Sequence, residues 1–207
     1  KEKELNELKS RFVAMTSHEF RTPLATILSS AELLEHYGAR LPAEDKLELY
    51  QSVRAAVERM TKMLDNVLII AKSEAEMLEF KPAPSDLAAF CGTLAEEMRL
   101  AAGRRHTLDY SYEGGHGTVR LDEKLLRHVL VNLISNAFKY SPQGGPVDFR
   151  VRAGGGEAAF EVADRGIGIP PEDQTRLFET FHRARNVGNI SGTGLGLAIV
   201  KKSLDLH

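Results

Sequence analysis

The chain has 207 residues, which allows one or two domains at roughly 100–200 residues per domain. Hydrophobic residues make up 43% and charged residues 27%, a balance that is typical of globular proteins and argues against global disorder. The formal net charge of -2 lacks the basic excess of a nucleic-acid-binding protein, so we expect no nucleic-acid partner.

Cysteine content and hydropathy bear on the compartment. The single cysteine, Cys91, excludes an internal disulfide framework and fits a reducing environment. No apolar run approaches the ~18 residues that a membrane span needs, so we expect this segment to make no membrane contact. The sequence therefore predicts a cytoplasmic domain, and leaves room for an inner-membrane anchor elsewhere in the parent protein.

Residues 1–80 are predicted to form two antiparallel helices. Apolar residues recur every three or four positions up to Gly38, and again over about 44–79. The expected apolar stripes are Leu24, Ile27, Leu28, Ala31 and Leu34 in the first helix, and Leu47, Tyr50, Val53, Val57, Met60, Leu64, Val67 and Ala71 in the second. Because one hairpin cannot bury both stripes well, we expect a homodimeric four-helix bundle, with a monomeric helical spacer as the alternative.

The pattern of residues changes after residue 80 from a continuous helical periodicity to a mixture of helix and strand signals. Pro82 and Pro84 interrupt any helix, so residues 81–86 are expected to form a linker, with Ser85 or Asp86 capping a helix over about 87–102. Strands are predicted at 106–112, 117–121, 147–153 and 158–163, and helices at 122–140, from about 170 and at about 195–206. This mixture indicates an α+β fold with helices on one face of a sheet, and the domain is expected to be truncated at its C-terminus.

One group of reactive residues lies in the first helix, in the stretch Ser17-His18-Glu19-Phe20-Arg21-Thr22-Pro23. Its polar neighbours predict that His18 faces solvent, where a neutral imidazole keeps a nucleophilic lone pair. Glu19 is placed to hold the other ring N–H, and Thr22 follows one turn later on the same helix face. Pro23 costs about 3 kcal/mol in an ordinary helix interior, which favours a functional role over a buried structural histidine.

A second group of residues is spread over residues 132–196. Asn132 and Asn136 share a helix face and offer oxygens of the kind that Mg²⁺ accepts when phosphates supply the rest. Lys139 is suited to a phosphate, and Tyr140 to stacking on a base.

Two glycine-rich stretches complete this group. Asp164 can accept a hydrogen bond from an exocyclic amine, and Gly166 and Gly168 allow close backbone approach. The run Gly192-Thr193-Gly194-Leu195-Gly196 precedes a helix, whose N-terminus suits a phosphate. Each feature alone is weak, since glycine clusters are usually turns and paired asparagines usually face solvent, but their order and spacing are more specific.

These stretches resemble the catalytic core of a bacterial two-component sensor histidine kinase over nearly the whole chain. FVAMTSHEFRTPLATI resembles the H box of that family, LLRHVLVNLISNAFKYSP its N box, VADRGIGIP its G1 box, LFETFHRA its F box and GTGLGLAIV its G2 box. The resemblance implies a dimerisation and histidine phosphotransfer domain over residues 1–80. It also implies an ATP-binding α/β sandwich of the GHKL superfamily over residues 87–207.

The resemblance implies a role for each candidate residue. His18 is the phosphoacceptor, Glu19 its acid/base partner, and Thr22 orients water when a partner regulator is dephosphorylated. ATP and Mg²⁺ are the implied cofactors. In the ATP-binding domain, Asn136 is the Mg²⁺ ligand with Asn132 beside the metal, Lys139 contacts phosphate, Tyr140 flanks the adenine, and Asp164 binds its amino group in a loop shaped by Gly166 and Gly168.

The resemblance also implies a mobile ATP lid from about Arg183 to Gly192. Arg183 or Arg185 contacts the γ-phosphate, and Thr193, Gly194, Leu195 and Gly196 form the phosphate loop and hinge. The implied partners are a second copy of the chain, bound through the helical hairpin, and the receiver domain of a response regulator.

The implied activity is phosphoryl transfer from ATP to His18 and then to a regulator aspartate, with regulator phosphatase activity as a further option. An ATPase of the same superfamily is one rival, but Asn132 stands where those enzymes have a glutamate, and an amide is a poor general base. A non-catalytic scaffold is the other rival.

The phenylalanines Phe138, Phe178 and Phe181 are expected in the core.

Overall fold

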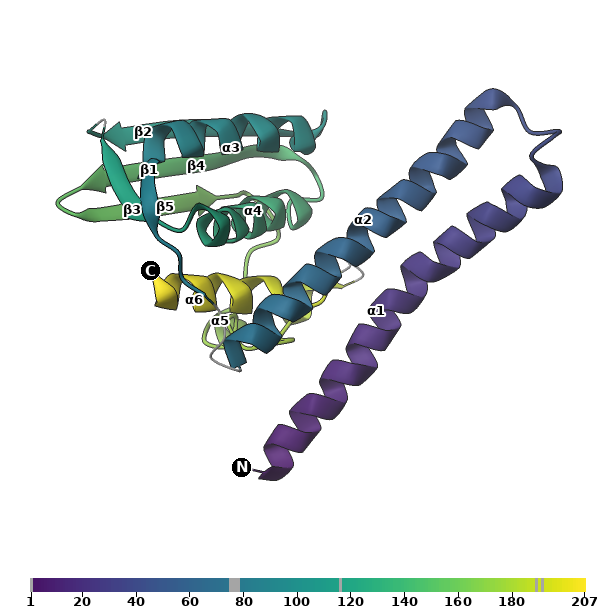
Figure 1. Ribbon diagram of the computed structural model, residues 1–207, viewed down its shortest axis with the longest axis horizontal. Helices are drawn as coiled ribbons and strands as arrows, with labels where there is room; N and C mark the ends of the chain where they lie inside the picture. The colour runs from purple at the N-terminus through teal and green to yellow at the C-terminus, as the bar shows by residue number, and fades with distance from the viewer. Residues whose placement is uncertain (1, 75–78, 116, 189, 191) are drawn as a thin grey trace. The chain divides into compact units, whose positions relative to one another are not determined.

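The computed structural model describes the backbone of residues 2–74, 79–115, 117–188, 190 and 192–207, and the side chains of these residues except 2–16, 18, 73 and 74. The chain divides into two compact units, Lys1–Glu74 and Ala75–His207. The first is helical and the second combines helices with a mixed sheet (Figure 1). The predicted α+β fold class is therefore confirmed.

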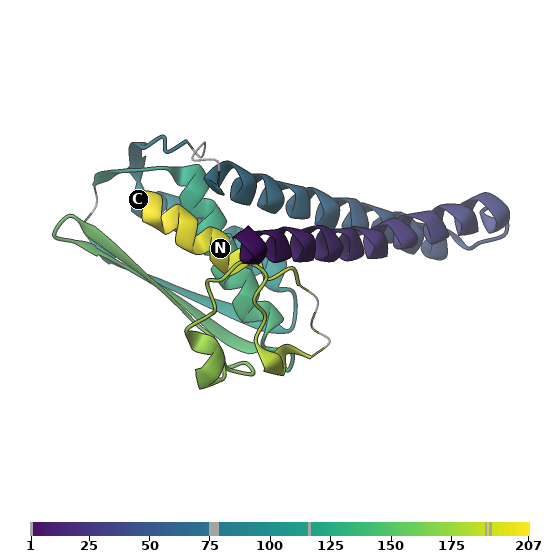
Figure 2. The ribbon, with the colours of Figure 1, turned by 90° about the horizontal axis from the view of Figure 1, so that it is seen from below.

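The helical unit is a hairpin of α1 (Glu2–Tyr37) and α2 (Ala43–Glu74), which run antiparallel (Figures 1 and 2). The second helix was expected to reach about residue 79, but Glu79 is not helical, and residues 75–78 lie outside the described residues. The backbone N–H of Lys81 donates to Asp122, and Pro82 disfavours a helical conformation in the residue before it. These constraints hold the chain away from a helical path near residue 80.

The apolar residues of the hairpin form two faces rather than the single stripe expected on each helix. The buried face, among the described side chains, consists of Pro23, Ser30, Ala56, Met63 and Ile70. Large apolar residues lie on an outer face and are exposed, namely Leu24, Leu28, Leu47, Tyr50, Val57, Leu64 and Leu68. None of the buried residues belongs to the predicted stripes, whose members on the outer face are exposed in the single chain. The expected burial of these stripes in a dimer stays a prediction.

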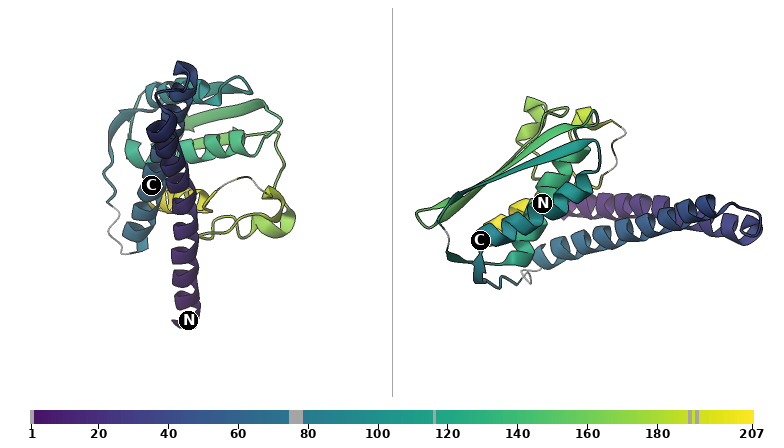
Figure 3. Two further views of the ribbon diagram at one scale, coloured as in Figure 1. Left: turned by 90° about the vertical axis from the view of Figure 1, so that its right-hand side faces the viewer. Right: turned by 90° about the horizontal axis from the view of Figure 1, so that it is seen from above.

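The second unit contains two sheets and several helices. Its elements are β1 (Ala83–Asp86), α3 (Leu87–Ala102), β2 (His106–Gly114), β3 (Thr118–Leu121), α4 (Glu123–Lys139), β4 (Gly145–Gly154), β5 (Glu157–Ala163), α5 (Pro171–Gln174), the 3-10 helix η1 (Arg185–Val187) and α6 (Gly196–Leu206). The larger sheet has the order β2-β4-β5, with β2 parallel and β5 antiparallel to β4. Helices α3, α4 and α6 gather on one side of it (Figure 3).

Local signals explain where these helices begin. The Asp86 carboxylate caps α3 by accepting the N–H of Ala89 at 3.0 Å, and the Asp122 carboxylate caps α4 by accepting the N–H of Leu125 at 3.1 Å. The helix α3 ends at Ala102 and is followed by Gly103, whose φ of 64° suits a residue without a side chain.

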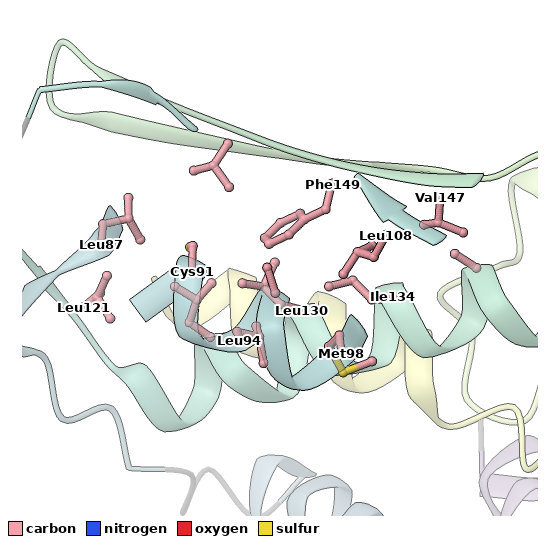
Figure 4. Packing of buried hydrophobic residues seen from close by; sticks show 14 residues of the cluster. Leu87, Cys91, Leu94, Met98, Leu108, Leu121, Leu130, Ile134, Val147 and Phe149 are labelled. Atoms are coloured by element: carbon pink, nitrogen blue, oxygen red, sulfur yellow. The ribbon is translucent and has the colours of Figure 1, made fainter. Parts of the chain in front are cut away.

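The core of this unit lies between the sheet and the helices α3 and α4. Phe149 on β4 faces Leu94 of α3 and Leu130 and Ile134 of α4, and all four side chains are fully buried (Figure 4). Cys91 belongs to the same cluster, and burial raises the pKa of its thiol to about 12, so it remains protonated and unreactive at neutral pH.

Part of the predicted linker is a strand. Residues Ala83–Asp86 form β1, which pairs antiparallel with β3 and sets Ala83 opposite Leu121. The prolines exclude a helix here, as expected, but they do not exclude a strand of a two-stranded sheet, in which each strand is an edge. Residues 83–86 of the predicted linker thus pair with β3 of the second unit, and the domain bounds themselves stay a prediction.

Candidate nucleotide and phosphoacceptor sites

The polar face of α4 meets the first turn of α6. Asn132 is 8% exposed, and its Nδ2 donates to the carbonyl of His128 at 2.8 Å. A Cβ placed on Gly196 would lie 3.0 Å from Asn132 Oδ1 and 3.8 Å from Asn136 Nδ2. The glycine therefore brings the start of α6 directly against both amides.

Lys139 and Tyr140 lie at the end of the same helix. The ammonium group of Lys139 lies 4.7 Å from the centre of the Tyr140 ring and donates to its hydroxyl at 3.2 Å. Gly192 lies against Lys139 Nζ so closely that a side chain at residue 192 would displace the ammonium group. The lysine is thus placed beside the glycine-rich run that precedes α6.

The loop after β5 also contacts the end of α4. The N–H of Ile167 donates to the carbonyl of Tyr140 at 2.9 Å, and Gly166 packs against that carbonyl with no room for a side chain. Asp164 Oδ1 accepts the N–H of Gly166 at 2.9 Å, and Asp164 is exposed. Gly168 has a φ of 66°. The predicted adenine loop is therefore held next to Tyr140 by backbone contacts.

The glycine-rich run is held by its own backbone. Gly194 has a φ of 68° and accepts the N–H of Phe181 at 3.0 Å. Thr193 Oγ1 accepts the N–H of Leu195 at 3.3 Å, and the Leu195 side chain is buried. Leu195 therefore anchors the run in the core, and only its backbone is available to a ligand.

The predicted lid residues lie between this run and α5. The guanidinium of Arg183 donates to the carbonyl of Ile190, within the lid itself, whereas Arg185 is exposed. The backbone N–H of Arg185 donates to Asp173 at 2.9 Å. Residues 189 and 191, which also belong to the predicted lid, lie outside the described residues.

Sequence reasoning missed two residues that hold this region. Asp173 is buried although it is acidic, and Asn186 Nδ2 donates to the carbonyls of Ile167 and Gly168 at 3.2 and 3.0 Å. The sequence pattern gave no signal for these contacts between distant positions. It did indicate the start of α5, because Glu172 follows Pro170 and Pro171. Phe178, which was expected in the core, is 49% exposed, so that expectation is wrong.

The phosphoacceptor group lies on α1. The side chain of His18 is outside the described residues, so its predicted exposure stays a prediction. Glu19 is partly buried, Thr22 is exposed, and Pro23 is buried within a continuous helix. A groove begins one turn after His18 and is lined by Arg21, Thr22, Ala25, Thr26, Ser29, Ser30, Leu33 and Ser52.

Two further findings hold for the described part of the chain. It contains no cluster of three or more His, Cys, Asp and Glu side chains that suits a metal ion. None of its helices combines the length and the apolar character needed to cross a membrane.

Comparison with known proteins gives two family matches. Residues 8–76 match the family of the His Kinase A (phospho-acceptor) domain. Residues 121–207 match the family described as histidine kinase-, DNA gyrase B-, and HSP90-like ATPase. His18 lies within the first match, and the nucleotide candidates from Asn132 to Gly196 lie within the second.

Individual relatives agree with these matches. Drug sensory protein A of Synechocystis sp. is 33% identical over 218 residues, covering 100% of this chain and 33% of that protein. The signal transduction histidine-protein kinase/phosphatase MprB of Mycobacterium avium is 31% identical over 209 residues, covering 99% of this chain and 39% of that protein. The chain belongs to the sensor histidine kinase family.

A solved histidine kinase structure has a similar fold. The structure of full-length ShkA in complex with AMPPNP has 29% identity and a TM-score of 0.65, and the match covers 95% of this chain and 41% of ShkA. The chain spans about a third of the length of the curated relatives that it matches. The second unit of this histidine kinase segment is therefore an ATP-binding domain, and the roles of single residues in it stay predictions.

Proposed function

We propose that this segment catalyses ATP-dependent phosphorylation of His18 and passes the phosphoryl group to an aspartate in the receiver domain of a response regulator. In this proposal, residues 1–80 serve as the dimerisation and phosphotransfer domain and residues 87–207 bind ATP. One observation carries it: three segments far apart in sequence, 132–140, 164–168 and 192–196, meet in direct contact around the end of α4. These segments hold the nucleotide candidates.

The adenine end of the proposed site is the loop after β5. Asp164 uses Oδ1 to order its own loop through the N–H of Gly166, and its second oxygen accepts a hydrogen bond from the amino group of adenine. Gly168 gives the loop its turn, and Tyr140 flanks the base.

The phosphate end is formed by α4 and the run before α6. Lys139 balances phosphate charge, the backbone N–H groups of residues 192–196 donate to phosphate oxygens, and Arg183 or Arg185 reaches the γ-phosphate from the lid. The donor set suits Mg²⁺: the Asn132 amide directs its nitrogen to His128 and its oxygen toward Gly196, next to the Asn136 amide. Asn136 is the proposed Mg²⁺ ligand with Asn132 beside it, and the ion supplies further neutralisation of phosphate charge when bound.

The proposed reaction is an in-line displacement. A nitrogen of His18 forms a bond to the γ-phosphorus of ATP while the bond to the β–γ bridging oxygen breaks, and ADP leaves. Glu19, the next residue, stabilises the positive charge that develops on the imidazole and takes up its proton. The same histidine then gives the phosphoryl group to a regulator aspartate, which completes the signalling step.

Phosphatase activity toward the phosphorylated regulator is a second function that one observation favours. Thr22 is exposed one turn after His18 and lines the groove on α1, so its hydroxyl is accessible to a docked regulator. The relative MprB is named as a kinase/phosphatase. In this function Thr22 orients the water that attacks the regulator's acyl phosphate.

The outer face of the hairpin supports the proposed dimerisation. The exposed apolar residues of this face, including Leu28 and Tyr50 at 60% exposure each, form a surface of the kind that monomeric proteins rarely expose. Packing against the same face of a second copy buries it in a four-helix bundle.

Incubation with ATP labelled in the γ-phosphate tests the proposed activity. We expect an acid-labile label on the wild-type protein that is absent from His18→Gln, since a phosphohistidine is stable to base and not to acid. Release of labelled phosphate without labelled protein would establish an ATPase instead. Neither label nor phosphate release would leave a nucleotide-binding scaffold and contradict the proposal.

A further inference from the structure

A buried carboxylate lies beneath the predicted lid. Asp173 is the third residue of α5, and only 5% of its side chain is exposed. A carboxylate removed from water requires hydrogen-bond donors or a cation to offset the loss of solvation. The partners of Asp173 therefore indicate what this residue holds in place.

One carboxylate oxygen caps the 3-10 helix at the start of the lid. Asp173 Oδ2 accepts the backbone N–H of Arg185 at 2.9 Å, across a separation of 12 residues. Arg185 begins η1, and the residue that precedes η1, Ala184, offers no side-chain cap. Because the first N–H groups of a helix have no partner within it, Asp173 supplies the cap that the local sequence lacks.

The second oxygen faces the segment that leads into the lid. Asp173 Oδ1 lies 3.3 Å from His182 Nε2, and only 10% of the His182 side chain is exposed. The preceding residue, Phe181, has a φ of 69°, which is unfavourable for a bulky side chain, and its N–H donates to the carbonyl of Gly194. The carboxylate thus contacts both ends of residues 182–185, and this segment is joined to the glycine-rich run.

A further contact relates η1 to the proposed adenine loop. Asn186 Nδ2 donates to the carbonyls of Ile167 and Gly168. The 3-10 helix therefore has two anchors, the Asp173 carboxylate on one side and the adenine loop on the other. A shift of η1 alters the spacing between the adenine loop and the lid.

We propose that Asp173 is a positioning residue for nucleotide binding: its carboxylate fixes η1 and His182, and so sets the base of the lid against the phosphate end of the site. This inference rests on the proposed function for the identity of the ligand as a nucleoside triphosphate. Asp173 itself does not touch the nucleotide.

The test compares substitutions of adjacent acidic residues in the full-length protein. Asp173→Ala removes both contacts, Asp173→Asn keeps one oxygen that accepts the Arg185 N–H, and Glu172→Ala is the matched control because Glu172 is exposed on the same turn. We expect Asp173→Ala to raise the Kd of a fluorescent ATP analogue and the KM for ATP about tenfold, the usual effect of losing a hydrogen bond to a charged group. Asp173→Asn is expected to give a smaller rise, and Glu172→Ala none.

Two readouts separate positioning from general damage and from failure of the proposed function. Damage to the fold lowers the active fraction, and hence the apparent kcat, but leaves the KM for ATP unchanged. A lowered kcat with an unchanged KM in Asp173→Asn would therefore overturn the proposal, even if Asp173→Ala does not fold. Hydrogen exchange of the Arg185 amide is measured without nucleotide, and it is expected to accelerate about tenfold in Asp173→Ala and less in Asp173→Asn. Equal exchange in wild type and both Asp173 variants would overturn the proposal, whereas a wild type that binds nucleotide without phosphorylating His18 would contradict only the proposed function.

Discussion

Gly194 lies between the lid and α6 at a position that suits only glycine. Its φ of 68° disfavours any other residue, and an added Cβ would lie 2.7 Å from the carbonyl carbon of Phe181. The obstacle is backbone, which cannot rotate aside as a flexible side chain can. Close approach and unusual conformation therefore coincide where the phosphate loop meets the residues before the lid.

We predict that Gly194→Ala weakens nucleotide binding more than it destabilises the second unit. The left-handed conformation costs an alanine about 1–2 kcal/mol, and relief of the clash moves the run away from Phe181. The checks are the Kd of an ATP analogue and the midpoint of urea unfolding. Gly154→Ala is the control, since a Cβ there meets nothing within 4 Å. Equal effects of both substitutions on the Kd would contradict this role for Gly194.

Thr22 allows the two proposed activities of the hairpin to be separated. Its side chain is exposed, and the proposed transfer from ATP to His18 assigns its hydroxyl no role. We predict that Thr22→Ala slows dephosphorylation of the regulator at least tenfold, as expected for loss of a water-orienting group, and leaves autophosphorylation within about twofold of wild type. Both rates are measured with purified phosphorylated regulator and with labelled ATP.

The control for this prediction lies one turn further along the same helix. Thr26 is also exposed, and its hydroxyl donates to the carbonyl of Thr22 at 3.2 Å. Thr26→Ala removes a hydroxyl from the same groove and should leave both rates unchanged. If Thr22→Ala slows both reactions equally, Thr22 has a structural role.

At the scale of elements, Asp122 joins three parts of the second unit. Its carboxylate caps α4 and accepts the N–H of Lys81 at 2.9 Å, while its own N–H donates to His207 Nε2 at 3.2 Å. Burial alone would raise the pKa of Asp122, but the backbone N–H groups of Lys81, Leu125 and Lys124 outweigh it and lower the pKa.

The lowered pKa predicts how stability depends on pH. A group whose pKa is lower in the folded state stabilises fully above its unfolded value, and this contribution is lost as pH falls through the folded value. We predict that Asp122→Asn flattens the fall in unfolding free energy below about pH 4, relative to wild type. Asp122→Ala should also lose about 1 kcal/mol at pH 7, because it removes the cap. Urea unfolding between pH 7 and pH 2 provides the measurement, and an unchanged slope in Asp122→Asn would refute the assignment.

The elements that the sequence predicted well are those with local signals. Asp86 and Asp122 each cap the helix that follows by accepting the N–H of the residue three positions ahead, and alternating polarity marked β4 and β5. The strand β1 was missed because its partner, β3, lies more than 30 residues away and only the pairing makes this segment a strand. The parallel register of β2 and β4 likewise has no local signal.

In the candidate site, too, the sequence predicted some residues and missed others. Motifs identified the residues that meet around the end of α4, because their types and order are themselves the signal. They did not identify Asp173, whose role depends on a contact with the Arg185 N–H that no spacing rule anticipates. Nor did they indicate that Arg183 donates to Ile190 within the lid while Arg185 is exposed.

At the scale of the whole molecule, the proposed dimer depends on the outer face of the hairpin. Leu28 on α1 and Tyr50 on α2 are each 60% exposed, so both helices of the hairpin contribute exposed apolar side chains. Burying such side chains fully stabilises by about 1.5–3 kcal/mol each, and several are available. In the proposed dimer, a second copy presents an identical face, so the interface is expected to be symmetric and self-complementary.

We predict that Leu28→Asp converts the dimer to a monomer, because it places a charge in the centre of an apolar interface, where desolvation of an unpaired carboxylate is unfavourable. Ser29→Asp adds the same charge at the next position, on a face away from Leu28, and should remain dimeric. Sedimentation equilibrium gives the mass of each variant, and circular dichroism checks that the helices persist. A dimeric Leu28→Asp, or a wild type that is monomeric at micromolar concentration, would show that the exposed face is not the interface.

Loss of autophosphorylation in the monomer would further indicate transfer between subunits, whereas retained activity would indicate that each subunit phosphorylates its own His18.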